Sequence, residues 1–292
     1  MSESHAPWPG TAAAPPPGEQ PREILITATR GWPRLRLGEI SAYRELLYFL
    51  VWRDVKVRYK QTALGIAWAV LQPLLTVVVF TVFFNRVGGI TVENVPYALF
   101  ALSGMVPWLF FANGVTIASA SVVTSVNLVT KVYFPRLVIP IASVLSNVPD
   151  LAIGFALLLI VMAAYGTAPT VAILLVPLVL LLVFAIALGV SLWLSALSVE
   201  FRDVRYVVPL LVQLWLLASP VAYDLSSLSS KWKTVLGLNP MAAPLELFRW
   251  AMLGTAAPPA SMVAVSCAVT VVTLVGGAYY FRAMERKFAD VA

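Results

Sequence analysis

The stretch "RDVKVRYKQTALGIAWAVLQP" (residues 53–73) carries all of its charge in the first eight residues and none afterwards. Those charges are Arg53, Asp54, Lys56, Arg58 and Lys60, and the next cation along the chain is Arg86. A helix needs about 20 mainly apolar residues to cross the hydrocarbon layer, and Lys and Arg collect at its cytoplasmic end. The stretch therefore predicts the cytoplasmic entry of a membrane span.

The composition of the whole chain agrees with a membrane protein. Of 292 residues, 60% are hydrophobic and 12% are charged, whereas soluble domains carry about 25% charged residues. The net charge of +6 does not suggest nucleic acid as a partner, because the cations lie at the ends of apolar runs. His5 and Cys267 are the only residues of their types, so no histidine-based catalytic or metal site and no intrachain disulfide is expected.

Six apolar segments are long enough to be membrane spans, and they predict an all-α integral membrane protein. They lie at about 63–84, 97–118, 137–164, 171–197, 206–222 and 262–281. With the N-terminus inside, the inner side holds sixteen of the 20 Lys and Arg residues. This distribution places both termini in the cytoplasm. The membrane domain is therefore expected over residues 63–284, followed by a cytoplasmic tail at 285–292.

The N-terminal residues divide into a Pro/Ala-rich tail at 1–22, expected to be disordered, and a cytoplasmic segment at 23–62. Within that segment an amphipathic helix is expected to lie in the inner membrane interface, facing anionic lipid. Its aromatic stripe would contain Tyr48, Trp52, Val55 and Tyr59, and its cationic face Arg53, Lys56 and Lys60.

The spacing of Asp54 and Arg58 in this helix suggests an ion pair. The alternation in "VKVRYK" leaves open an extended ending to the segment. The cations either only anchor the first span or also dock a cytoplasmic partner, and composition does not separate these two readings.

The loop at residues 223–261 is long, and "APLELFRWAMLG" (243–254) predicts an amphipathic outer helix that ends at Gly254. Glu246 and Arg249 are spaced to pair on one face of it; an ordinary packed loop is the alternative. Asp150 follows Pro149 in the third span, and we expect it to act as a packing or capping residue at a helix break.

The opening stretch resembles the ABC type-2 transport permeases, in the branch that exports bacterial polysaccharides. The resemblance continues in the same order through "NLVTKVYFPR" (127–136), "FRDVRYVVP" (201–209), "SPVAY" (219–223), "LNPM" (238–241) and "FRWAMLG" (248–254). It covers about residues 24–290 and does not include the Pro/Ala-rich extension.

The resemblance implies the membrane subunit of an exporter rather than an enzyme. Such a permease works as a homodimer with two copies of a separate ATP-binding subunit. The chain has no G-x-x-x-x-G-K-[ST] segment, so ATP and Mg²⁺ would be bound by the partner and no cofactor by this chain. The cargo would be a lipid-linked polysaccharide such as O-antigen, moved across the cytoplasmic (inner) membrane. The alternative within the family is an exporter of a lipid, a drug or another small molecule.

The resemblance also suggests roles for particular residues. A coupling helix that contacts the ATPase would contain Asn127, Leu128, Lys131, Val132 and Tyr133. The interface helix would carry nucleotide-driven motion into the first span. Weaker candidates are Trp108, Phe111 and Trp215 for an aromatic substrate channel, and Tyr223, Asn239, Pro240, Glu246 and Arg249 for an outer gate.

Two readings from other classes are disfavoured by the residues themselves. An ion-coupled carrier would need several intramembrane charges and an inverted repeat. A membrane-embedded enzyme would need a cluster of acids, bases or metal ligands. Neither pattern is visible in the sequence.

Overall fold

The computed structural model describes residues 37–60, 67–89, 92, 95–131, 134–225 and 230–285. Every regular element in these residues is a helix, which confirms the predicted all-α class. The predictions made for the tail at 1–22, the segment at 23–36, Val132, Tyr133 and residues 286–292 lie outside the described residues.

Five helical segments are long and apolar enough to cross a membrane. They are α3 (Ala67–Phe80) continued by the π-helical η1 (Thr81–Val87), α4 (Tyr97–Thr124), α6 (Val138–Leu145) with α7 (Val148–Ala164), the 3₁₀ turn η2 (Val171–Leu175) with α8 (Val176–Glu200), and α12 (Ala260–Met284). The chain is therefore a multi-pass membrane protein.

The predicted fifth span corresponds to α9 (Val204–Leu217), which has 14 residues. At 1.5 Å per residue it is about 21 Å long, less than the roughly 30 Å of hydrocarbon in a bilayer. The sixth crossing and the cytoplasmic position of both termini thus stay predictions.

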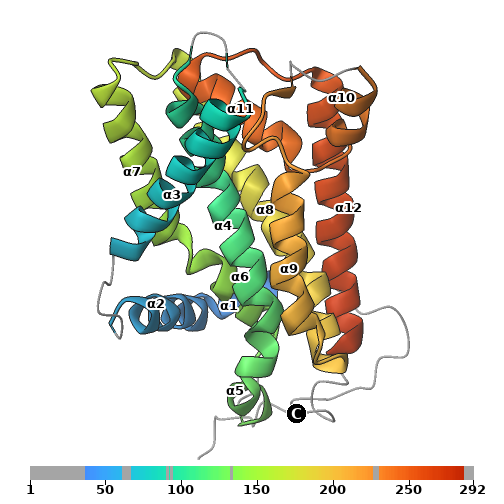
Figure 1. Cartoon of the computed structure of the whole chain (residues 1–292). Coiled ribbons are helices and arrows are strands. Elements are labelled where there is room, and N and C mark those ends of the chain that lie inside the picture. The colour runs from blue at the N-terminus through green and yellow to red at the C-terminus, as the bar shows by residue number, and fades with distance from the viewer. Residues whose placement is uncertain are drawn as a thin grey trace, which may run out of the picture. The chain divides into compact units, whose positions relative to one another are not determined.

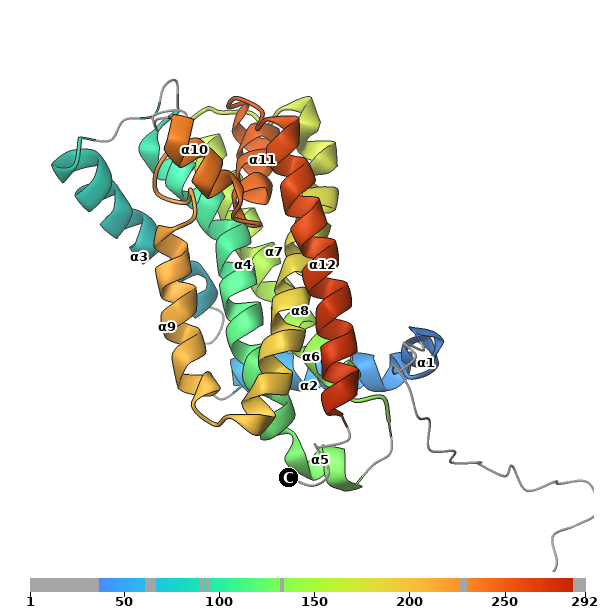
Figure 2. The same cartoon turned by 90° about the vertical axis from the view of Figure 1, so that its right-hand side faces the viewer.

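Helix α4 forms the centre of the bundle, with α3 and α9 beside it and α8 and α12 behind (Figures 1 and 2). In its most apolar window 83% of the residues are buried, against 17–28% in the other four segments. Behind it α8 and α12 approach closely, because Gly189 and Gly277 present no side chain at their contact. Trp193 and Tyr280 stack beside this contact with ring centroids 4.7 Å apart.

The predicted interface helix is α2 (Arg44–Lys60), preceded by the short α1 (Leu37–Ala42). It runs across the long helices rather than along them (Figures 1 and 2). Leu50 is buried against residues that include Val138 and Ile139 at the start of α6. The helix continues to Lys60, so the alternative of an extended ending is wrong.

The third predicted span is not one continuous helix. It breaks at Ser146 and Asn147, between α6 and α7. Pro149 causes the break, because its nitrogen has no hydrogen to donate to the carbonyl of Leu145 four residues earlier. The break leaves the polar groups of Ser146 and Asn147 near α2. In a continuous helix their backbone groups would take part in the helix's own hydrogen bonds.

The long outer loop contains α10 (Ser230–Gly237) and α11 (Ala242–Leu253) at the end of the bundle opposite α2 (Figure 1). Helix α11 ends at Gly254, which adopts a left-handed conformation with φ of 70°. This confirms that a helix forms here and ends at the glycine. The helix is buried on most sides rather than amphipathic, and its position on the outer side of the membrane stays a prediction.

Candidate functional site

The predicted coupling residues lie on α5 (Val126–Lys131), at the tip of the bundle beyond α2 (Figures 1 and 2). Asn127 and Lys131 are exposed, while Leu128 packs against the cluster that contains Phe134 and Leu137. The tip thus presents polar side chains outward on an apolar base. Contact with an ATPase stays a prediction for these residues.

The chain that leaves this tip is fixed to the end of α12. The backbone N–H of Arg136 donates to Glu285 Oε1 at 3.2 Å, and its guanidinium donates to the Glu285 carbonyl. Arg282 pairs with the other carboxylate oxygen of Glu285 at 3.1 Å. These bonds join the residues just before α6 to the end of α12.

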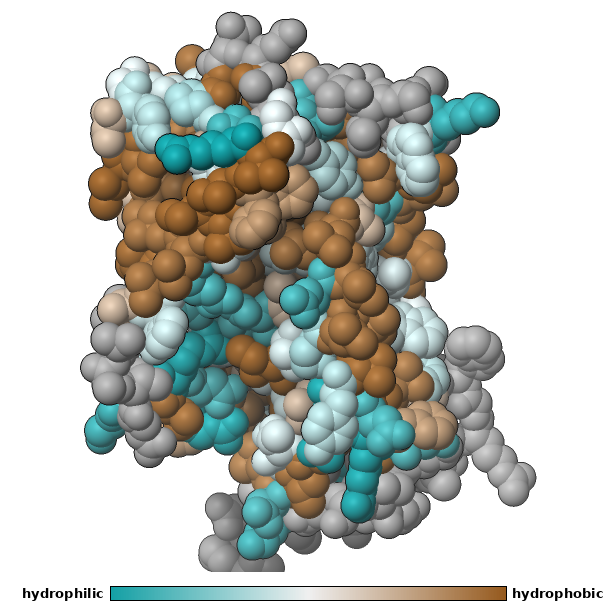
Figure 3. Space-filling view, in the orientation of Figure 1, coloured by the Kyte–Doolittle hydropathy of each residue, from teal (hydrophilic) through white to brown (hydrophobic). Residues whose placement is uncertain are grey.

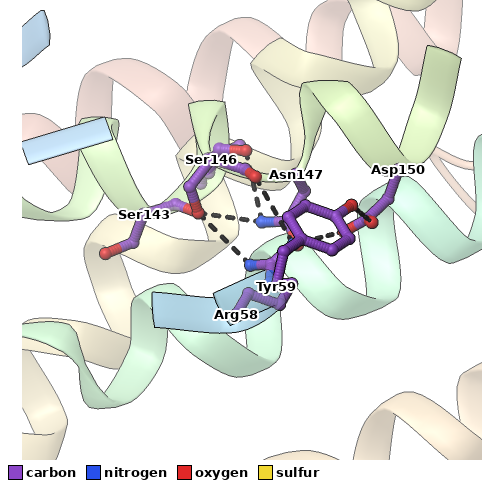
Figure 4. Close-up of polar contacts among 7 residues, drawn as sticks. Arg58, Tyr59, Ser143, Ser146, Asn147 and Asp150 are labelled. Carbon is purple, nitrogen blue, oxygen red and sulfur yellow. Dashed lines mark hydrogen bonds and ion pairs between the residues drawn. The ribbon is translucent and has the colours of Figure 1, made fainter. Parts of the chain in front are cut away.

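The end of α2 is bound to the break in the third span by a polar cluster, drawn in Figure 4. Arg58 forms an ion pair with Asp150, and the Tyr59 hydroxyl donates to the other oxygen of that carboxylate. Arg58 also donates to the Ser146 carbonyl at 3.4 Å and to the Ser146 hydroxyl at 3.3 Å. We call Arg58, Tyr59, Ser146 and Asp150 the α2 latch.

The latch corrects one prediction from the sequence and agrees with another. Asp54 pairs with its neighbour Arg53 at 2.8 Å, and Arg58 reaches Asp150 instead of Asp54. Asp150 lies in the first turn of α7, at the predicted break, and its carboxylate joins α7 to α2, as expected for a packing residue.

The latch is partly shielded from solvent. The side chains of Arg58 and Asp150 are 25% and 22% exposed, so their attraction is screened less than that of a surface pair. Burial and the hydrogen bond to Asp150 raise the pKa of the Tyr59 hydroxyl above its ordinary value. Tyr59 therefore stays a hydrogen-bond donor at physiological pH.

The other residues of the interface helix that are candidates from the sequence lie on its more exposed side. Trp52, Arg53, Lys56 and Lys60 are exposed, and Asp54 is partly exposed. The Lys56 ammonium lies 5.2 Å from the centroid of the Trp52 ring. Trp52 and Lys56, which the helical spacing assigns to separate faces, thus lie side by side. An exposed ring beside a cation suits the headgroup region of a bilayer, and a position in the membrane interface stays a prediction for this helix.

The three candidate channel rings are brought together but are not equally accessible. Ring centroids of Trp108 and Phe111 lie 5.3 Å apart, and those of Phe111 and Trp215 lie 5.0 Å apart. Trp108 and Phe111 are 2% and 0% exposed, so in this conformation they are core residues and cannot line a path. Only Trp215 keeps some exposed surface.

At the outer end, Asn239 joins three segments. Its side-chain oxygen accepts from Trp215 Nε1 at 2.9 Å and from the Met241 N–H at 3.0 Å, and its amide donates to the Ser219 hydroxyl at 2.9 Å. Pro240 accepts from the hydroxyl of Ser266 on α12 at 2.6 Å. These bonds fix the turn before α11 to α9 and α12.

Arg249 of α11 is fully buried and pairs with Glu246 at 3.0 Å, as the spacing predicted. Its guanidinium donates to the carbonyls of Pro220 and Val221, just past α9, and lies 3.7 Å from the centroid of the Phe100 ring.

Gly104 of α4 leaves room for the buried side chain of Arg249, because a Cβ at position 104 would collide with the Arg249 guanidinium. Of the five residues proposed for an outer gate, Glu246 and Arg249 are therefore buried structural anchors in this conformation. Tyr223 remains partly exposed.

Sequence reasoning missed Ser146 and Asn147, and it left Asp150 without its partners. One signal was available: "SNVPD" (146–150) places four polar or helix-breaking residues inside an apolar run. Local spacing could not identify Arg58 as the partner of Asp150, because Arg58 lies 92 residues earlier in the chain.

Comparison with known proteins identifies the family. The profile of a family described as "ABC-2 type transporter" matches residues 45–253. The chain belongs to the ABC-2 type transporter family. That match contains the α2 latch, α5, α9 and α11 and ends with the last residue of α11.

Named relatives of this ABC-2 family member are transport proteins. An O-antigen export system permease protein RfbA of Myxococcus xanthus is 32% identical over 254 residues, which are 86% of this chain and 97% of the relative. An RfbA permease of Klebsiella pneumoniae is 28% identical over 206 residues, covering 70% and 79% of the two chains. The polysialic acid transport protein KpsM of Escherichia coli is 23% identical over 206 residues, covering 69% and 78%.

These names agree with the prediction that the chain is a transport subunit rather than an enzyme. They also agree with the polysaccharide-export branch that the sequence motifs indicated.

Proposed function

We propose that this ABC-2 family member is the permease subunit of an exporter that moves a lipid-linked polysaccharide, such as O-antigen, across the cytoplasmic membrane. The observation that carries the proposal is its similarity to an O-antigen export permease over 97% of that protein's length. The polysialic acid transport relative supports the wider class of polysaccharide cargo.

The proposed assembly is a homodimer with two copies of a separate ATPase, which binds ATP and Mg²⁺. Helices α3 and α9 flank α4 on one side of the bundle (Figure 2). Both helices carry exposed apolar side chains. On α3 and η1 these include Leu75, Val78, Val79, Val82 and Phe83, and on α9 Leu210, Leu211, Leu214 and Leu217. Such a face needs either lipid or a second copy, and the cargo path would lie where two copies meet.

The proposed route for the force begins at the cytoplasmic end. The exposed tip of α5 would contact the ATPase. The α2 latch would transmit part of its motion, because α2 is bound to the start of α7 and precedes α3 in the chain. A rigid connection of this kind couples two helices without requiring them to be continuous.

A null mutant of the source bacterium tests the proposed cargo. Loss of one surface glycan, with lipid-linked glycan accumulating in the cytoplasm, is the expected result. Complementation with the wild-type gene should restore the surface glycan. Unchanged surface glycans together with failed efflux of a drug or lipid would instead support the alternative cargo class.

A further inference from the structure

A pocket of about 280 Å³ lies among α2, α3, α4 and α7, beside the α2 latch. In Figure 3 hydrophilic surface gathers at the level of α2, below the apolar belt. Three amide side chains and one exposed indole ring contribute to its lining: Gln72, Asn113, Asn147 and Trp68. The volume is close to the low end of small-molecule sites, which span about 300–1,000 Å³. The pocket therefore suits one small ring rather than a chain.

The charges around the pocket cancel. Arg58 and Asp150 are the only charged residues among the described residues that line it, and they pair with each other. A phosphate would have to approach the Asp150 carboxylate and compete with it for Arg58. A neutral polar ligand meets no such repulsion.

The hydrogen-bonding groups favour a ligand that can donate. Asn147 is fully buried, and its amide nitrogen donates to the Ser143 carbonyl at 2.8 Å. Its side-chain oxygen has no hydrogen-bond partner among the described residues. A buried acceptor without a partner is unfavourable, so a ligand with a hydroxyl to donate is favoured here. Ionised phosphate oxygens only accept.

Two further amides and a ring complete the recognition chemistry. The side chains of Gln72 and Asn113 make no hydrogen bond to another described residue. Each can donate to and accept from adjacent hydroxyl groups. Trp68 is 51% exposed, and an indole face packs against the C–H groups of a sugar ring.

We propose that this pocket binds a single neutral, hydroxyl-bearing sugar ring of the cargo, at the depth of the inner membrane interface. The inference rests on the proposed function, and it adds a recognition site separate from any path between two copies. The ring nearest the lipid anchor is the one that reaches this depth, since α2 is the predicted interfacial helix.

The test uses the full permease purified with its ATPase in nanodiscs of phosphatidylethanolamine and phosphatidylglycerol, without sugar detergents. Saturation-transfer NMR measures binding of free glucose and of N-acetylglucosamine, with inorganic pyrophosphate as competitor. The wild type should bind at least one sugar, and pyrophosphate should not displace it. Asn113→Leu and Trp68→Leu should each weaken binding by about 2- to 10-fold, as expected for one lost neutral contact.

Matched controls keep the result specific. Gln213→Leu removes an exposed amide from α9 and should bind like the wild type, and Trp68→Phe should retain most of the affinity. Each variant is first checked for unchanged thermal unfolding. Equal binding by wild type, Asn113→Leu and Trp68→Leu, absence of sugar binding, or displacement by pyrophosphate would overturn the inference.

The two proposals can fail separately. If the null mutant loses surface glycan while the pocket variants bind sugar normally, the pocket inference is wrong and the proposed function stands. If the null mutant keeps its surface glycans, the proposed function fails whatever the pocket binds.

Discussion

The α2 latch should contribute to the stability of this ABC-2 family member as one coupled unit. Asp150→Asn removes the charge at constant shape, and Arg58→Met removes the guanidinium while keeping an apolar stem. Each single variant breaks the ion pair between Arg58 and Asp150 and leaves the remaining charge partly buried. The double variant removes both charges, so its stability should be at least that of the less stable single variant.

The magnitude follows from the exposure of the pair. Exposed ion pairs contribute about 0–1 kcal/mol, whereas breaking a buried pair costs about 3–5 kcal/mol. With side chains 25% and 22% exposed, Arg58 and Asp150 lie between these limits. Hydrogen bonds to charged groups contribute about 1.5–3 kcal/mol, so each single variant should lose about that much. At roughly 2 °C per kcal/mol for a long chain, the unfolding temperature should fall by about 3–6 °C.

Thermal unfolding in nanodiscs measures the four proteins of this double-mutant cycle. Arg53→Met is the matched control, because Arg53 pairs with the adjacent Asp54 and its side chain is 41% exposed. The control should change the unfolding temperature by no more than about 2 °C. Additive losses in the double variant would show that Arg58 and Asp150 do not act together, and would refute the latch.

Three further results are expected. Gly104→Ala should destabilise the protein by about 1–3 kcal/mol in thermal unfolding, because the added methyl group collides with the buried guanidinium of α11; unchanged stability would contradict that packing. Since the pKa of Tyr59 is raised in the folded state, its contribution is complete below about pH 10 and is lost as pH rises above that value. Tyr59→Phe should therefore reduce the decrease in unfolding temperature that occurs at alkaline pH. The same change at the exposed Tyr48 should leave that decrease unaltered. Identical pH profiles for wild type and Tyr59→Phe would exclude a contribution of the Tyr59 hydroxyl. Lys131→Glu should reduce copurification of the ATPase at least several-fold and leave the spans folded, whereas Lys231→Glu on α10 should not; equal recovery of the ATPase would remove α5 from the contact.

Local patterns were sufficient to predict several elements. Hydropathy located α3 and α12 to within four residues at each end, because each is a long apolar segment between charged or Gly/Pro-rich turns. It located the start of α4 and the end of α8 as well, but α4 continues six residues past the predicted end at 118 and α8 begins five residues after the predicted start at 171. The end of α11 was predictable because a glycine is suited to the left-handed residue that follows a helix.

Contacts between distant residues could not be predicted in the same way. The spacing of Asp54 and Arg58 permitted a pair, but the folded chain offers Arg58 a carboxylate 92 residues away. Aromatic residues in an apolar run look the same whether they line a path or fill a core, and Trp108 and Phe111 fill the core. The pocket likewise depends on four helices meeting, which no single segment encodes.

The most direct test of the proposed function is transport in reconstituted proteoliposomes. The lipid-linked glycan is placed in the outer leaflet of the vesicles, on the same side as the added nucleotide. The permease alone should neither hydrolyse ATP nor translocate the glycan. Adding its ATPase should produce both activities, and a variant of the ATPase that binds but does not hydrolyse ATP should abolish sustained transport. ATP hydrolysis by the isolated permease, or uphill transport without the ATPase, would contradict the account.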